Sequence, residues 1–182
     1  MPTMTMEQYN FIQKWADLGG PVVRANGLPV SAMIACASVE SGWGKGGIYM
    51  ATRNPFSLQK WPHITYPRTY KTLWRDTIVQ TNPVMKLKAP FNCALDEADA
   101  ARQWCEWILH YGAADGPPQD QNSKAQQVSH ATAAAARQAL LGQRGNPVEF
   151  TRRLSTIGFG ENRAKGAVYA QRLVNFAMED FD

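Results

Sequence analysis

Apolar side chains recur along most of this chain at the three- and four-residue spacing of an amphipathic helix. The stretch 11–18 follows this spacing, with Thr5 and Gln8 forming a capping-box pattern ahead of it and Gly19-Gly20-Pro21 ending it. We expect further helices over 29–41, 95–111, 125–141, 146–154 and 166–180. In the helix over 95–111, the expected buried face consists of Leu95, Ala98, Cys105, Ile108 and Leu109.

One segment departs from the helical pattern. Residues 70–80 are rich in aromatic and β-branched side chains, Thr81-Asn82-Pro83 is a turn signal, and 85–89 alternates with period two. This pattern predicts a β-hairpin, with 60–91 as a small lobe inserted into a helical protein. At 182 residues the chain is long enough for one domain and short for two, so we expect a single mainly helical α+β domain over 1–182.

Charge is concentrated in the part of the chain that contains this lobe. Between Ser41 and Leu95 there are eight basic residues and one acid, Asp76, which gives +7 and leaves −3 for the rest of this +4 chain. The same segment contains eight aromatic residues. Basic and aromatic residues together bind single-stranded nucleic acid or an anionic glycan, or they form a solvated hairpin edge protected by lysines. On charge alone, the solvated edge is the favoured interpretation.

Composition argues against a membrane protein and against a metalloprotein. Glu7, Lys14 and Asp17 interrupt any signal-peptide apolar region, and no apolar run approaches the roughly 20 residues of a membrane helix. The three cysteines and three histidines lack metal-ligand spacing, so we expect neither a metal nor another cofactor. Cys36 and Cys105 are interpreted as small core residues, although one disulfide is compatible with the sequence.

A lone carboxylate ends the most apolar of the expected helices. Glu40 is the only charged residue between Arg24 and Lys45. It follows Cys36 by four residues and Ala37 by three, so its side chain leans back over the apolar stripe. An acid held against apolar atoms keeps its proton more readily, and in that state it can protonate a leaving oxygen. The alternative is a helix-end glutamate that faces solvent, and the spacing leaves both interpretations open.

Three short motifs add a family resemblance. Residues 35–44, ACASVESGWG, form an alanine-rich helix end followed by Glu-Ser-Gly-Trp-Gly, while residues 54–58 are NPFSL and residues 168–173 are VYAQRL. In this order they resemble the catalytic-helix motif, the Asn-Leu-Phe-Gly-Ile segment and the Tyr-Ala-X-Lys-Leu motif of glycoside hydrolase family 73. That family contains peptidoglycan-cleaving β-N-acetylglucosaminidases, among them flagellar muramidase-type domains and many autolysins.

The resemblance implies a lysozyme-like helical lobe with the β-hairpin flanking a cleft. It makes Glu40 the general acid of a glycosidase whose substrate is peptidoglycan, with no nucleic-acid partner. It places Asn54 and Phe56 on the cleft floor. It also implies that Tyr169 faces the sugar. The alternative is that Tyr169 is a core residue on the apolar face of its helix. Trp43 is either a platform for a sugar ring or a packing residue.

Glycoside hydrolysis usually requires a second carboxylate, which family 73 places as a glutamate on the hairpin. Here Asp76 is the only acid between Glu40 and Asp96, and it lies on the first expected strand of the hairpin. The basic residues around it favour the ionised form that a base requires. Because aspartate is one methylene shorter than the glutamate of the family, the N-acetyl group of the substrate is the alternative to Asp76.

The expected function is therefore cleavage of the β-1,4 glycosidic bond of peptidoglycan, of the N-acetylglucosaminidase type. A lytic transglycosylase is an alternative, although nothing in the chain resembles the Gly-Leu-Met-Gln segment of those enzymes. A non-catalytic basic protein that binds glycan or nucleic acid is another.

Because peptidoglycan lies outside the cytoplasm and no signal peptide is recognised, delivery needs another route. We expect an antibacterial effector of the type VI secretion kind that acts in the periplasm of a target bacterium. A phage endolysin released by lysis is the alternative. An effector of this kind implies a periplasmic immunity protein that covers the cleft between Glu40 and the hairpin.

Overall fold

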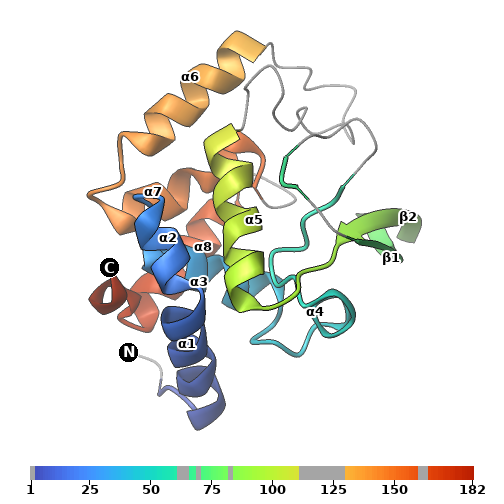
Figure 1. Ribbon diagram of the computed structural model, residues 1–182, viewed down its shortest axis with the longest axis horizontal. Helices are drawn as coiled ribbons and strands as arrows, with labels where there is room; N and C mark the ends of the chain where they lie inside the picture. The colour runs from blue at the N-terminus through green and yellow to red at the C-terminus, as the bar shows by residue number, and fades with distance from the viewer. Residues whose placement is uncertain (1–2, 61–65, 69–70, 82–83, 111–129, 160–163) are drawn as a thin grey trace.

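The computed structural model describes residues 3–60, 66–68, 71–81, 84–110, 130–159 and 164–182. Helices gather around a central helix, and a two-stranded sheet projects at one side of them (Figure 1). The elements are α1 (Met6–Leu18), α2 (Gly20–Ala25), α3 (Val30–Glu40), α4 (Gly47–Thr52), β1 (Thr72–Thr81), β2 (Val84–Asn92), α5 (Glu97–His110), α6 (His130–Leu141), α7 (Pro147–Arg153), α8 (Lys165–Asn175) and 3₁₀ helices Leu154–Ile157 and Met178–Phe181. This arrangement confirms the expected mainly helical α+β class.

Helix α3 is the centre of the hydrophobic core. All residues from Val30 to Ser38 are buried, and α1, α2, α7 and α8 pack against the helix. A helix that is apolar on every side is stable only when it is surrounded by other elements, which explains its central position. Glu40 is the last residue of this helix, at its C-terminal end.

The N-terminal helices begin and end at the signals in the sequence. The Thr5 side chain accepts a hydrogen bond from the Gln8 backbone at 3.3 Å, and the Gln8 side chain accepts one from the Thr5 backbone at 2.9 Å. This completes the capping box of α1. Gly19 ends α1 as expected, but α2 begins at the next residue and was not expected. Pro21 explains it, because proline fits the first turn of a helix.

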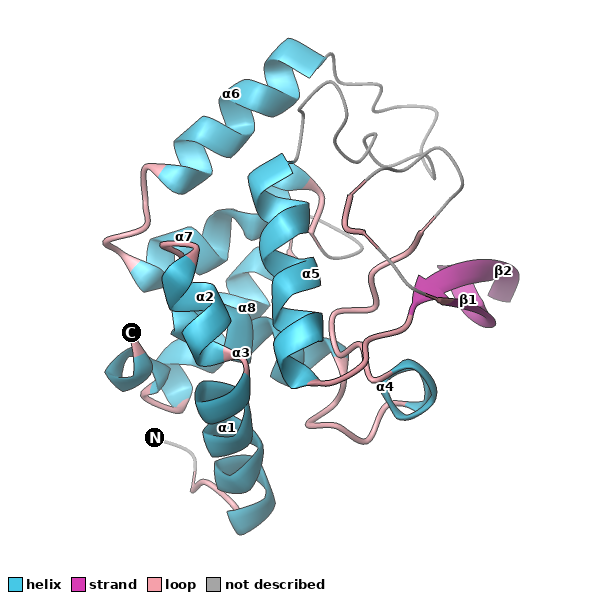
Figure 2. Cartoon of the chain, in the orientation of Figure 1, coloured by secondary structure: helices cyan, strands magenta, loops and turns pink. Residues whose placement is uncertain are grey.

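The expected hairpin is confirmed. Strands β1 and β2 pair antiparallel from Thr72 opposite Asn92 to Thr81 opposite Val84, with one irregularity between Ile78 and Gln80. Figure 2 shows the pair extending away from the helices beside α4, with which both strands are in contact.

The buried face of α5 differs from the expected one at its start. Leu95 was expected on this face, but it is 62% exposed, so that expectation is wrong. The reason is that α5 begins only after Asp96, whose side chain accepts a hydrogen bond from the Asp99 backbone at 2.8 Å. Leu95 therefore precedes the helix and has no place on its face. Cys105 and Ile108 are buried as expected.

The other expected helices are present with shifted boundaries. The structure describes α6 from His130, so the expected helical residues 125–129 lie outside the described residues. Asn146 caps α7 through a 3.1 Å hydrogen bond from the Glu149 backbone, with Pro147 in the first turn as the sequence indicates. The last expected helix, 166–180, consists of α8 and the 3₁₀ helix Met178–Phe181.

Helices α7 and α8 come very close together at Gly166. A Cβ atom at this position would lie 2.0 Å from the backbone oxygen of Arg152, which no side chain allows. Only glycine permits this approach. The close packing fixes the first turn of α8, which carries residues of the candidate site.

Candidate active site

The carboxylate of Glu40 is held between two helices. Its side chain is only 12% exposed, at the end of α3. From α8, the hydroxyl of Tyr169 donates a hydrogen bond of 2.5 Å to Glu40 Oε1, and Nζ of Lys165 forms an ion pair of 3.2 Å with the same oxygen. The side chain is therefore fixed by contacts across the core and does not extend freely into solvent.

Helix α8 supplies both partners because Lys165 and Tyr169 are four residues apart and share one face. Tyr169 is fully buried, and its ring lies edge-on to Phe159 with centroids 6.0 Å apart. The structure thus places the Tyr169 hydroxyl on Glu40, while its contact with a sugar stays a prediction. Lys165 was not among the residues predicted from the sequence. Its position four residues before Tyr169 was the signal that could have revealed it.

Both described partners of Glu40 bind Oε1 and none binds Oε2. Two donors on one oxygen fix the plane of the carboxylate. One anchored oxygen and one available oxygen suit a general acid.

A tight turn follows Glu40 and explains the Ser-Gly-Trp-Gly sequence. Gly42, Trp43 and Gly44 all have positive φ angles, of 55°, 61° and 82°. The buried Ser41 holds the turn, because its hydroxyl donates to the Ala37 carbonyl at 2.6 Å and accepts from the Gly44 backbone at 2.9 Å. Glycines fit this left-handed backbone, whereas Trp43 adopts it at a cost in strain.

Contacts of its indole ring hold Trp43 in this conformation. Phe11 lies edge-on at 5.7 Å and Phe176 edge-on at 5.1 Å between ring centroids. The guanidinium of Arg172 lies 4.8 Å from the centre of the indole. Trp43 is thus half-buried in a cluster from three parts of the chain, and its use as a sugar platform stays a prediction.

Asn54 and Phe56 lie inside the protein. Asn54 is 1% exposed, and its side chain accepts from the Phe56 backbone at 3.1 Å and donates to Gln103 at 3.5 Å. Phe56 is 3% exposed and packs against Trp15 and Trp104 at centroid distances of 5.8 and 6.0 Å. These contacts fix the segment that follows α4. Direct contact of either residue with substrate stays a prediction.

Asp76 lies on β1, directly opposite Lys88 of β2. Asp76, its neighbour Arg75 and Lys88 are all exposed. The hairpin contacts α4, which follows the turn after Glu40. The polar partners of Glu40 among the described residues are Lys165 and Tyr169, and Asp76 is not one of them, so the role of Asp76 as a base stays a prediction.

The three cysteines are free thiols. Burial, together with the nearby charge of Glu40, raises the pKa of the Cys36 thiol well above its usual value. Burial also raises the pKa of Cys105, to about 12. Neutral buried thiols are poor nucleophiles, so these two residues belong to the core. No group of potential metal ligands occurs within the described ranges, and none of the helices described there is long and apolar enough to cross a membrane.

Comparison with solved structures identifies the fold. The catalytic domain of the autolysin Auto from Listeria monocytogenes is similar with a TM-score of 0.69 and 14% identity, over 100% of this chain and 91% of that chain. The glycoside hydrolase domain of FlgJ from Salmonella typhimurium is similar with a TM-score of 0.56 and 14% identity, over 94% and 89% of the two chains. This is the family 73 glycoside hydrolase fold.

A third similar structure is a type VI secretion system effector–immunity complex from Pseudomonas protegens. Its TM-score is 0.56 at 17% identity, over 96% of this chain and 94% of that chain. The sequence matches no protein-family model and no curated protein. The lysozyme-like fold that the three motifs implied is confirmed, and the similar structures are those of cell-wall hydrolases and of an effector complex.

Proposed function

We propose that this chain is a peptidoglycan hydrolase that cleaves the β-1,4 glycosidic bond of the glycan strand, of the N-acetylglucosaminidase type. The observation that carries the proposal is the position of Glu40, anchored through one oxygen at the end of a buried helix. The fold supports it, because structures of peptidoglycan hydrolases, including one from Sphingomonas, are similar over most of the chain.

In this proposal Glu40 acts as the general acid. Its Oε2 gives a proton to the glycosidic oxygen as the bond to the leaving sugar breaks. The negative charge that then develops on the carboxylate is stabilised at Oε1 by the Tyr169 hydroxyl and the Lys165 ammonium. Both donors are already in place before the reaction, so no reorganisation is needed when the charge appears.

The second half of the reaction needs a group on the opposite face of the sugar. Asp76 is the candidate, either as a base that activates water or as a nucleophile. Its exposed carboxylate on β1 is accessible to a polymer bound beside the hairpin. The N-acetyl group of the substrate is the alternative nucleophile, in which case Asp76 is not required.

The hydroxyl of Tyr169 offers a test of this mechanism that leaves the general acid intact. Tyr169→Phe is expected to lower kcat for sacculus hydrolysis by about 10-fold or more, because a hydrogen bond to a charged group contributes about 1.5–3 kcal/mol. KM should change little. The measurement is the rate of release of soluble fragments from purified sacculi. Tyr9→Phe, an exposed tyrosine of α1, serves as the matched control. An unchanged kcat in Tyr169→Phe would contradict the proposed role.

We also propose that the chain acts as an antibacterial effector in the periplasm of a target cell and is neutralised by an immunity protein. Similarity to a structure from a type VI effector–immunity complex supports this. The net charge of +7 between Ser41 and Leu95 favours an acidic binding face on that partner.

Expression in a Gram-negative host with and without an added periplasmic signal tests the site of action. We expect growth arrest and lysis only from the exported protein, and no toxicity from exported Glu40→Gln. Equal toxicity in both compartments, or none after export, would contradict the effector proposal. The chain would then be interpreted as an endolysin or as a binding protein.

A further inference from the structure

Arg172 of α8 is a half-buried cation held over aromatic rings. Its guanidinium lies 4.8 Å from the centre of the Trp43 ring and 5.7 Å from that of Phe176. Burial lowers the pKa of Arg172 from its usual value. A guanidinium that stacks on an aromatic face keeps its N–H donors directed outward in its own plane.

These donors have no acceptor within the described part of the chain. No ion pair or hydrogen bond of Arg172 occurs there, in contrast to Arg152 and Arg153, which share Glu149, and Arg102, which pairs with Asp99. Partly buried charges are usually paired, since leaving water is costly for an ion. An unpaired guanidinium in this setting points to an anion that the described part of the chain does not supply.

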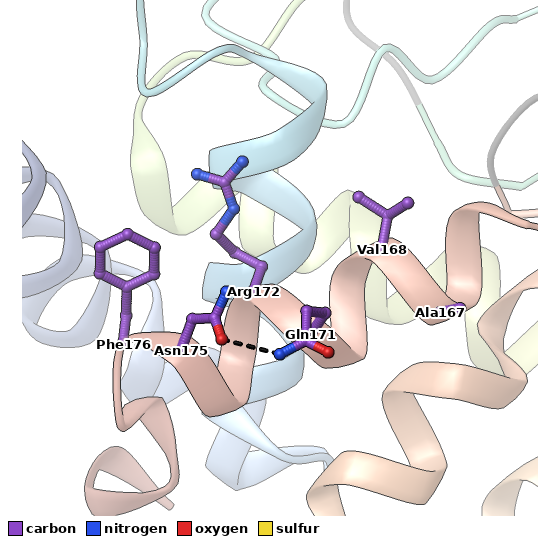
Figure 3. Close-up of a pocket in the computed structure, with 6 residues that line it drawn as sticks. All are labelled: Ala167, Val168, Gln171, Arg172, Asn175 and Phe176. Atoms are coloured by element: carbon purple, nitrogen blue, oxygen red, sulfur yellow. Dashed lines mark hydrogen bonds between the residues drawn. The ribbon is translucent and has the colours of Figure 1, made fainter. Parts of the chain in front are cut away.

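A surface hollow gives such an anion access to Arg172. The hollow has a volume of about 460 Å³. It is lined by Ala167, Val168, Gln171, Arg172, Asn175 and Phe176. Figure 3 shows Arg172 rising from α8 between Phe176 and Val168. The side chain of Asn175 accepts a 2.7 Å hydrogen bond from Gln171, which fixes its amide and leaves its nitrogen as a further donor.

Arg172 and the candidate active site belong to the same two segments of the chain. Arg172 follows Tyr169 by three residues on α8, and Trp43 follows Glu40 by three residues after α3. Two contacts therefore join α8 to the end of α3 and the turn after it. Tyr169 contacts Glu40, and Arg172 contacts Trp43 at the neighbouring position. Along α8 the two positions differ by about 4.5 Å, at a rise of about 1.5 Å per residue. A glycan whose scissile bond lies at Glu40 would bring an adjacent sugar near Arg172.

We propose that Arg172, supported by Trp43 and Phe176, binds a carboxylate that the glycan carries next to the bond cleaved at Glu40. This rests on the proposed function. In peptidoglycan the carboxylate belongs either to the lactyl group of a muramic acid that carries no stem peptide, or to the stem peptide where one is attached. Arginine is suited to carboxylates because its paired N–H groups bind both oxygens. Proximity to Glu40 favours the glycan over an acidic side chain of a protein partner.

Binding to an inactive form of the enzyme tests the proposal. Calorimetry would compare Glu40→Gln with Glu40→Gln/Arg172→Met, in which methionine keeps an apolar stem over Trp43. The ligands are neutral N-acetylglucosamine oligomers, glycan strands stripped of peptides, and peptide-bearing strands. We expect Arg172→Met to weaken binding of the carboxylate-bearing strands by about 10-fold or more and of the neutral oligomers hardly at all. Arg144→Met, which removes an exposed arginine before α7, should change none of the affinities.

The pattern of losses identifies the source of the carboxylate. Weaker binding of stripped strands assigns it to the lactyl group, and weaker binding of peptide-bearing strands alone assigns it to the stem peptide. Equal affinities of the two variants for every ligand would overturn the proposal, while the proposed function would stand. If Glu40→Gln binds no fragment at all, the proposed function itself fails and this inference fails with it.

Discussion

Glu40→Gln is expected to lower the hydrolysis of purified sacculi by about 10²–10⁴-fold, which is the usual contribution of a positioned general acid. Glutamine has the same size and keeps an oxygen that can accept from Tyr169 and Lys165, so the contacts across the core persist. What it loses is the proton for the leaving oxygen. The rate of release of soluble glycan fragments is the measurement.

A matched variant separates loss of chemistry from loss of fold. Glu179→Gln changes an exposed glutamate of the C-terminal 3₁₀ helix and should hydrolyse sacculi at the wild-type rate. Both variants should melt within a few degrees of the wild type. Near wild-type hydrolysis by Glu40→Gln would show that Glu40 is not the general acid.

Asp76→Asn is expected to lower the same rate by about 10²-fold or more, because asparagine can neither activate water nor attack the sugar. The melting temperature should hardly change, since Asp76 is exposed on β1 and contributes no buried packing. Asp76→Glu should retain activity, because it restores the longer carboxylate that family 73 places on this hairpin.

Asp180→Asn, at another exposed aspartate, is the control for a change of one charge. Normal digestion by Asp76→Asn would show that the hairpin supplies no catalytic carboxylate. The substrate N-acetyl group would then become the favoured nucleophile. Mass spectrometry of the protein during turnover would distinguish a covalent intermediate on the protein, which adds the mass of the sugar, from an intermediate formed within the substrate, which does not.

Local signals in the sequence predicted most of the secondary structure. The capping box at Thr5 and the Asn146–Pro147 cap each specify a helix start from neighbouring residues alone, and both are present. The turn signal at 81–83 lies between the two paired strands, with residues 82–83 outside the described residues. The error at Leu95 shows the limit of periodicity. An apolar side chain can continue a helical spacing on the N-terminal side of the residue at which the helix begins.

The contacts of the candidate site depend on residues that are distant in the sequence. Glu40 could be selected because it is a lone charge on an apolar helix, but its pairing with Lys165 spans 125 positions. Similarly, Arg172 stacks on Trp43 only because α8 packs against the end of α3. Helical spacing predicts neighbours within one helix only. These partners are therefore known only from the way in which the helices pack in the structure.

The central claim is that this chain cleaves the glycan strand of peptidoglycan with Glu40 as the acid. The most direct measurement is mass spectrometry of the fragments that the wild-type protein releases from purified sacculi, with Glu40→Gln as the blank. We expect fragments that end in a reducing N-acetylglucosamine and that are missing from the Glu40→Gln sample. Fragments ending in reducing muramic acid or in 1,6-anhydromuramic acid would contradict the proposed bond or reaction, and no release of glycan fragments by the wild type would contradict the central claim itself.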